Sequence, residues 1–204
     1  MGAHRKRRHS ARHLLTEHLV AGRTCGDCAH CCDFKAVRAP GFFKPAGERC
    51  PHSTGCSCAI YETRPEPCRG WHCLWRRIEA LPDEARPDLS GVAFEIMSDA
   101  GSEDPLEHLF ISALALDHHS AFQRPEVQGW IGLFIQGEGN LPVFASWRDH
   151  SLMIYPAPDI AAAARDETLP PPPGKEAAVE RWRQRLHDIR AERAERGLPA
   201  IPPA

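Results

Sequence analysis

The pattern of apolar and polar residues changes along the chain and predicts most of the regular elements after residue 89. It predicts strands at residues 91–97, 142–147 and 152–155, and either a strand or a short helix at 109–116. After Pro125, apolar side chains recur at positions 127, 130, 131, 134 and 135, which is the spacing of one helix face. We expect these elements to share a core, because Met, Trp and Phe residues in such elements are usually packing residues.

The C-terminal part predicts two helices separated by a proline-rich spacer. Asp159 can cap an alanine-rich helix at residues 160–165, and the prolines at 170–173 form a stiff spacer. A longer helix is expected at residues 175–196, with a narrow apolar stripe formed by Val179, Trp182, Leu186 and Ile189. That stripe can dock on the body of the protein or on a partner protein, and the pattern does not choose between them.

Residues 25–73 show little apolar periodicity and contain all nine cysteines of the chain. A segment rich in Gly, Pro, Cys and Arg cannot bury much apolar surface, so we expect another interaction to hold it together, and a metal ion can do so. An odd number of cysteines cannot pair completely in disulfides, and a reducing compartment favours metal binding over a disulfide framework. Short helices are expected on either side of this segment, at residues 10–20 and 71–80.

Length, charge and hydropathy narrow the class of protein. A chain of 204 residues with a formal net charge of −2 fits a globular protein of one domain, or of one domain with an annex, and nucleic acid is not an expected partner. The longest uncharged apolar stretch of the second half, residues 129–137, is far shorter than the roughly 20 residues that a membrane helix needs. We expect a cytoplasmic protein without a membrane partner, since the basic residues 4–9 are not followed by the apolar run of a signal peptide.

The cysteines fall into two groups whose spacing is typical of metal ligands. The first group consists of Cys25, Cys28, Cys31 and Cys32, in which overlapping CxxC spacings can turn sulfur atoms toward one ion. The second group follows a loop of seventeen residues and consists of Cys50, Cys56, Cys58, Cys68 and Cys73. Thiolates suit zinc, iron or an iron–sulfur cluster, and nine thiols exceed what one tetrahedral ion uses. The number of cysteines allows either two metal ions or one polynuclear cluster. Adjacent Cys31 and Cys32 cannot easily reach the same point from an extended chain, so one of them can serve a second metal or bridge two.

The same residues resemble a known family. The order CxxCxxCC, then Cys-Pro, then Cys-x-Ile-Tyr-x-x-Arg-Pro-x-x-Cys-Arg is similar to that of the YkgJ-type cysteine-cluster family, a zinc- or iron-chelating domain. The resemblance covers about residues 22–75 and implies metal chelation without implying a reaction. The metal ligands that it implies are Cys25, Cys28, Cys31, Cys32, Cys50, Cys58 and Cys68. Tyr61, Arg64, Pro65 and Arg69 also match the pattern, whereas Cys56 and Cys73 fall outside it.

Other side chains near the cysteines have two interpretations each. Arg64 and Arg69 flank Cys68 and can either favour its thiolate or form ordinary surface ion pairs. Tyr61 is expected to cover the site as a packed ring. A role other than metal ligand is expected for His30, His52 and His72, and for the more distant His118, His119 and His150.

We therefore expect an α+β protein in which a small, metal-stapled, cysteine-rich module with short helices packs on a small mixed α/β region, followed by a C-terminal helix. The expected divisions are a basic tail and short helix at 1–21, the cysteine-cluster module at 22–80, the α+β region at 81–168, and the spacer and last helix at 169–204. The leading hypothesis is a protein that chelates zinc or iron. The alternatives are a metal-dependent enzyme with an open coordination position, and a thiol-redox or interaction module. No catalytic residue is predicted, because the chain lacks a glycine-rich phosphate loop and a nucleophile elbow.

Overall fold

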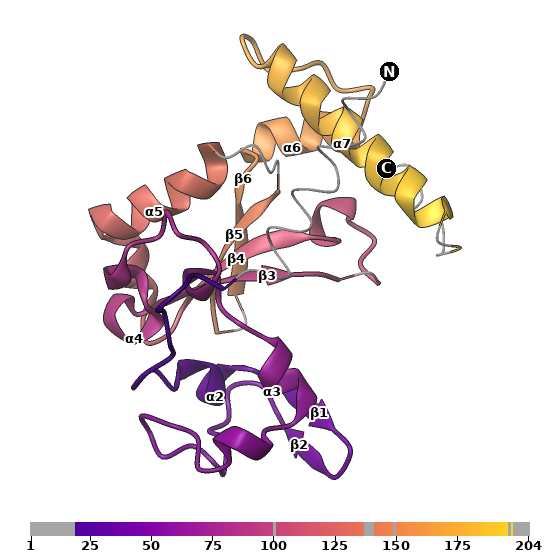
Figure 1. Ribbon diagram of the computed structural model, residues 1–204. Coiled ribbons are helices and arrows are strands. Elements are labelled where there is room, and N and C mark those ends of the chain that lie inside the picture. Colours follow the sequence, from indigo (N-terminus) through magenta and orange to yellow (C-terminus); the bar gives the residue numbers. More distant parts are fainter. Residues whose placement is uncertain (1–18, 100, 137–140, 149, 196, 198–204) are drawn as a thin grey trace. The chain divides into compact units, whose positions relative to one another are not determined.

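The computed structural model describes residues 19–99, 101–136, 141–148, 150–195 and 197, and Figure 1 shows a mixed α+β protein with short helices and a long C-terminal helix. The chain forms two compact units, which we call unit 1 and unit 2. Unit 1 contains residues 1–95, 113–133 and 146–150, and unit 2 contains residues 96–112, 134–145 and 151–204. The expected helix at residues 10–20 lies almost entirely outside the described residues.

The cysteine-bearing segment of unit 1 is built from short elements separated by turns. They are α2 (His30–Phe34), β1 (Val37–Ala39), β2 (Phe42–Lys44), a 3-10 turn at Tyr61–Thr63, α3 (Glu66–Gly70) and a 3-10 turn at Leu74–Arg76. β1 and β2 form an antiparallel hairpin with Val37 opposite Lys44, and Gly41 supplies the positive φ of 73° that its tight turn requires. The apolar pattern did not predict this hairpin, because its strands are only three residues long.

The prediction of a short helix at residues 71–80 is wrong. The helix of this region, α3, ends at Gly70, and the backbone of Trp71 and Cys73 is extended. Only a 3-10 turn follows, at Leu74–Arg76, where Leu74 and Trp75 are both buried. An extended entry followed by one tight turn therefore buries these two apolar side chains, and it places the buried Cys73 directly before the turn.

Four strands form the larger sheet, in the order β3-β4-β5-β6. They are β3 (Val92–Met97), β4 (Phe110–Ala115), β5 (Val143–Trp147) and β6 (His150–Tyr155). The strands predicted at residues 91–97, 142–147 and 152–155 are confirmed, and the ambiguous segment at 109–116 is a strand. The first four residues of β3 are all buried, so this strand has no solvent-exposed face at its start.

The apolar core of unit 1 lies around the start of β3. The elements that lead into β3 are a 3-10 turn at Asp83–Ala85 and α4 (Pro87–Ser90), and Gly91 ends α4 in the left-handed conformation with φ 66°. A further 3-10 turn at His119–Gln123 precedes α5 (Pro125–Gln136), which confirms the helix predicted after Pro125. Trp130 of α5 meets Phe94 of β3 edge to face, with ring centroids 6.5 Å apart.

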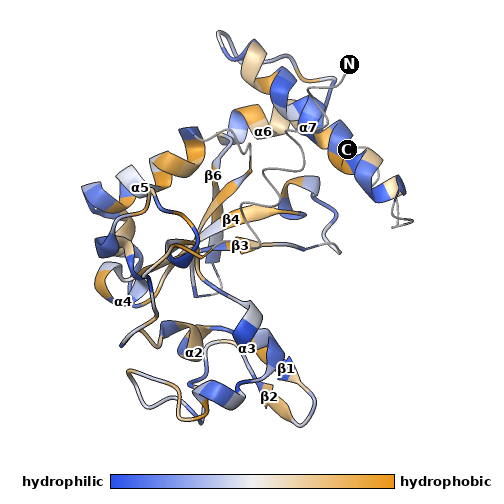
Figure 2. Ribbon diagram, viewed as in Figure 1, coloured by the Kyte–Doolittle hydropathy of each residue, from blue (hydrophilic) through white to orange (hydrophobic). Residues whose placement is uncertain are grey.

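Unit 2 has an apolar core of its own, formed where two helices pack together. These are α6 (Pro158–Arg165) and α7 (Glu176–Glu195), next to a 3-10 turn at Pro105–Glu107. The buried side chains of this core are Leu106, Ala161, Ala164, Trp182 and Leu186. The stripe predicted on the last helix is buried, and Figure 2 shows its apolar positions as patches on an otherwise hydrophilic α7. It therefore docks on the body of the protein, on α6.

Asp159 does not cap α6 as the sequence predicted. Ala157 occupies the capping position, and Asp159 lies inside the first turn of the helix. There its carboxylate accepts a hydrogen bond from the backbone N–H of Ile160 and pairs with Lys175 at 2.8 Å. Pro158 at the first helical position explains the difference, because its fixed φ starts the helix two residues earlier.

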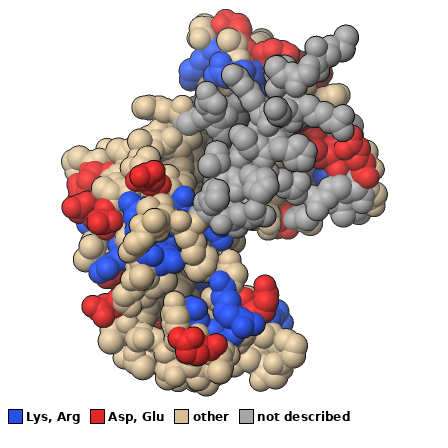
Figure 3. Space-filling model, viewed as in Figure 1, with Lys and Arg blue, Asp and Glu red and all other residues tan. Residues whose placement is uncertain are grey.

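The surface of the protein carries charged side chains of both signs. On the face drawn in Figure 3, acidic and basic side chains are interspersed over the described residues. None of the described helices has the length and apolar character that crossing a bilayer requires.

Replacing Leu186 by alanine should destabilise unit 2. The side chain is 1% exposed, so the change leaves a cavity between α6 and α7 and should lower the free energy of unfolding by about 2–4 kcal/mol. Urea unfolding measures the loss, and amide hydrogen exchange should rise in both helices together. Leu169→Ala is the matched control, because Leu169 is 42% exposed and its loss should cost less than about 0.5 kcal/mol. Equal effects of the two changes would contradict the packing described.

Candidate metal centre

A small cavity in unit 1 collects more than half of the cysteine side chains. Its volume is about 60 Å³, and five cysteines line it: Cys25, Cys28, Cys31, Cys68 and Cys73. A water molecule needs about 10–15 Å³ in the same measure, so the cavity has room for an ion and a few waters but not for an organic cofactor. Cationic side chains in its wall include Lys35, Arg64 and Arg76.

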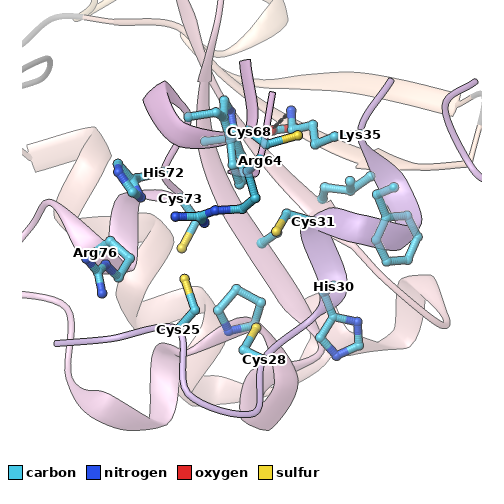
Figure 4. Close-up of a pocket in the computed structure, with 16 residues that line it drawn as sticks. Cys25, Cys28, His30, Cys31, Lys35, Arg64, Cys68, His72, Cys73 and Arg76 are labelled. Carbon is cyan, nitrogen blue, oxygen red and sulfur yellow. Dashed lines mark ion pairs between the residues drawn. The ribbon is translucent and has the colours of Figure 1, made fainter. Parts of the chain in front are cut away.

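Four cysteines from three separate segments form what we call the first thiol group: Cys25, Cys28, Cys31 and Cys73. Figure 4 shows the sulfur atoms of Cys25 and Cys73 pointing toward one another, with Cys28 and Cys31 beside them. In the same view the Cys68 sulfur points toward Lys35 and away from this space. The first thiol group thus joins residues that lie as far apart in the chain as Cys25 and Cys73.

Local backbone structure positions each member of the first thiol group. A turn between Cys25 and Cys28 is closed by a hydrogen bond of 2.9 Å from the Cys28 N–H to the Cys25 carbonyl, with Gly26 at φ 53°. Cys31 is the second residue of α2, and Cys73 directly precedes the 3-10 turn at Leu74–Arg76. The sulfurs approach one another because a turn, a helix start and an extended segment all end at the same cavity.

Backbone N–H groups donate hydrogen bonds to two of these sulfurs. Cys28 accepts from the N–H groups of His30 and Asp88, and Cys73 accepts from those of Trp75 and Arg76. Burial is the main influence on both thiols: it raises the pKa of Cys28 to about 11 and raises the pKa of Cys73. The amide donors act in the opposite direction and favour the thiolate, which is the form that binds a metal.

Four other cysteines form what we call the second thiol group: Cys32, Cys50, Cys58 and Cys68. Cys50 is fixed beside Cys32 by a hydrogen bond of 2.9 Å from its N–H to the Cys32 carbonyl. Cys58 is tied to the same loop, since it forms an isolated bridge with Ser53, whose own N–H donates to the Cys50 carbonyl. Burial raises the pKa of Cys68, and repulsion from Cys32, Cys50 and Cys58 raises it further, which places all three near it.

Lys44 secures the loop that carries Cys32 and Cys50. Its side chain is almost fully buried, and its ammonium group donates to the backbone carbonyls of Asp33 and Pro45 at 3.3 and 3.0 Å and also to that of Glu48. Asp33 directly follows Cys32, and Glu48 lies two residues before Cys50. A buried ammonium group needs such partners, so the same bonds that satisfy Lys44 also fix the positions of the two cysteines.

Adjacent Cys31 and Cys32 belong to different thiol groups but contact each other through sulfur. A hydrogen bond between their side chains is the main influence on both: it raises the pKa of Cys31 and lowers the pKa of Cys32 to about 7. The positive charges of Lys44 and Arg64 also favour the Cys32 thiolate. Cys31 has Cys25 and Cys28 as further neighbours, whereas Cys32 lies near Cys68. Apart from their mutual hydrogen bond, the two thiols therefore have different cysteine neighbours.

Arg64 is the cation shared by both thiol groups. Its charge favours the thiolates of Cys32 and Cys68, and Figure 4 shows its guanidinium group reaching toward Cys73. The interpretation of Arg64 as a partner of the cysteines is thus favoured over that of a surface ion pair. Arg69 is exposed. Tyr61 is 50% exposed and stacks with Arg64, with the guanidinium carbon 3.5 Å from the ring centroid, so its ring lies against the arginine.

The nearby histidines have ring contacts or line the cavity. His30 stacks on Phe34 with centroids 6.2 Å apart, and His52 packs against Phe42 at 5.5 Å. His72 lines the cavity, where burial and then the charges of Arg76, Arg77 and Arg64 lower its pKa. Among the described residues, His30 and His72 are the histidines of the cavity wall, and His72 is a candidate for a nitrogen ligand.

All seven cysteines expected as metal ligands fall in the two thiol groups, and the structure adds Cys73 to them. All nine cysteines are free, and Cys56 is exposed and lies outside both groups. Among the described residues, no three Cys, His, Asp or Glu side chains are close enough to hold one ion in the positions seen. A change of χ1 rotamer moves a cysteine sulfur without moving the backbone, so the thiol groups are arrangements of backbone that could close on an ion.

An ion pair lies in the cavity wall beside the first thiol group. The Lys35 ammonium group pairs with the Glu95 carboxylate of β3 and also lies 4.8 Å from the centroid of the Trp71 ring. Burial lowers the pKa of Lys35 to about 8, with the negative charge of Cys31 acting in the opposite direction. Because Glu95 is only 5% exposed, it depends on Lys35 as its counter-charge.

Glu95→Gln should destabilise unit 1, because it leaves the Lys35 charge in the cavity wall without its carboxylate. We expect the free energy of unfolding to fall by about 1–3 kcal/mol, and the double variant Lys35→Met/Glu95→Gln to recover part of that loss. Urea unfolding of the three proteins measures both changes. Exposed Glu84 offers the control Glu84→Gln, which should be neutral within about 0.5 kcal/mol. Equal losses in the single and double variants would show that the pair has no role.

Comparisons with known proteins identify no relative. No family model matches the chain, and neither the curated proteins nor the solved structures contain a match. The resemblance to the YkgJ-type cysteine-cluster family thus stays a prediction from the motif.

Proposed function

We propose that this protein binds zinc or iron through the thiolates of its cysteine-rich segment. The observation that carries the proposal is the convergence of Cys25, Cys28, Cys31 and Cys73 on one small cavity. A set of four sulfur ligands is typical of tetrahedral zinc sites and of iron–thiolate sites. A cavity of about 60 Å³ suits an ion better than an organic ligand.

The surroundings of the thiols support this proposal. Backbone N–H groups already point at the sulfurs of Cys28 and Cys73, and such donors stabilise metal-bound thiolates. Burial works against the same thiolates as long as no cation is present, which makes them poor sites for isolated negative charge. A divalent cation reverses this balance, because it neutralises the thiolates and holds them deprotonated.

Two other functions use the same residues. A thiol-redox role is favoured by the hydrogen bond between Cys31 and Cys32, which supplies a thiol and a readily ionised neighbour. A metal-dependent enzyme would use the remaining space of the cavity for an exchangeable ligand, with Arg64 and His72 in its wall. Either function fits the reducing, cytoplasmic compartment expected from the sequence, and metal content separates the redox role from the other two.

Freshly purified full-length protein should contain at least one equivalent of zinc or iron. Elemental analysis measures the metal, and absorption in the visible region distinguishes iron from zinc. Cys28→Ser should give metal-poor protein, because the metal-linked folding free energy of a structural site is on the order of 10 kcal/mol and one ligand carries a large part of it.

Cys56→Ser is the matched control. It replaces an exposed thiol outside both thiol groups, so it should keep its metal and cost about 1 kcal/mol or less. Wild-type protein that holds far less than one equivalent, with nine reactive thiols and an unchanged fold, would sink the proposal.

A further inference from the structure

We infer that the cysteine-rich segment holds two separate metal ions, one in the first thiol group (Cys25, Cys28, Cys31 and Cys73) and one in the second (Cys32, Cys50, Cys58 and Cys68). This inference rests on the proposed function and assigns the ligands of each ion. It makes Cys73 a ligand, although that residue lies outside the sequence motif. It also makes each centre mononuclear, with four thiolate ligands and no sulfur shared between them.

The number of thiols fits two tetrahedral ions. A tetrahedral zinc or iron ion takes four thiolates, and eight of the nine cysteines fall into two sets of four. The ninth, Cys56, is exposed, and its sulfur lies 3.9 Å from the Thr54 hydroxyl oxygen. No thiol is left over inside either group, and none has to be shared.

The direction of α2 separates the two sets. Cys31 and Cys32 are consecutive residues of this helix, and consecutive helical side chains point about 100° apart around the axis. Cys31 lines the cavity together with Cys25, Cys28, Cys73 and Cys68, whereas Cys32 is absent from its wall, and the Cys68 sulfur points away from the other four toward Lys35 (Figure 4). The carbonyl of Cys32 instead holds the N–H of Cys50 at 2.9 Å. One helix therefore presents one thiol to each set.

Each set is also positioned by its own backbone elements. The turn at Cys25–Cys28 and the 3-10 turn that follows Cys73 position the first set. The loop fixed by Lys44 and the Ser53–Cys58 bridge position the second set. Positive charge is divided between them, with Arg76 near Cys73, Lys44 near Cys32, and Arg64 next to both sets. A pair of tetrathiolate centres carries net negative charge, which these cations offset.

Native mass spectrometry of zinc-loaded, full-length protein tests the inference by counting ions. Wild-type protein and Cys56→Ser should hold two ions, Cys73→Ser and Cys50→Ser one each, and the double variant Cys73→Ser/Cys50→Ser none. Loss of both ions in each single variant would indicate one shared cluster and overturn the inference. One ion in the wild-type protein would also overturn it while leaving the proposed function intact, and no ion would overturn both.

A measurement on wild-type protein keeps the test independent of how well the variants fold. Cobalt(II) titrated into the apoprotein should give the spectrum of tetrahedral cobalt with four thiolates for both equivalents. The paramagnetic signal per cobalt should stay constant up to the second equivalent, because the two ions share no sulfur. A fall in that signal at the second equivalent would reveal a thiolate bridge, and acid-labile sulfide in the protein as purified would reveal an iron–sulfur cluster; either result would overturn the inference.

Discussion

Thiol groups gathered in partly buried positions create the electrostatic constraint on which unit 1 depends. Burial raises the pKa of Cys28, Cys68 and Cys73, so without a cation these side chains stay protonated and hold one another only weakly. The backbone nevertheless aims amide donors at two of the sulfurs and sets Arg64 beside both thiol groups. This arrangement favours negative sulfur, and a bound divalent cation is the direct way to produce it.

The two units differ in what holds them together. Unit 2 has the apolar core between α6 and α7, which is enough to specify how those helices pack. Between residues 19 and 73, by contrast, the buried side chains are Ala29, Val37, Lys44 and Cys73. Of these, only Val37 and the alkyl part of Lys44 bury more than two carbon atoms. So small an apolar surface stabilises a segment of this length poorly, and buried hydrogen bonds such as those of Lys44 set geometry more than they add stability. Metal coordination supplies the kind of energy that this segment lacks.

Periodicity was a good guide wherever an element packs against a core. It predicted β3, β5, β6, α5 and α7, whose apolar spacing reflects packing against a core. It failed at residues 71–80, where an extended entry and a single turn bury Leu74 and Trp75 without an amphipathic helix. Cysteine spacing placed Cys73 with the second group of cysteines, and the family-like motif left it out. Its neighbours Cys25 and Cys28 are distant in the chain, and only the chain path brings them together. The buried pair that follows Cys73 was the available signal, since a thiol next to a buried turn is carried into the interior with it.

X-ray absorption spectroscopy of the metal-loaded protein reads the ligands of the ion itself and so tests whether two separate ions are each bound by four thiolates. We expect four sulfur atoms at about 2.3 Å from zinc, with no nitrogen or oxygen ligand and no second metal within bridging distance. A first shell of mixed nitrogen, oxygen and sulfur, or scattering from a second metal nearby, would contradict the assignment of eight thiolates to two separate ions.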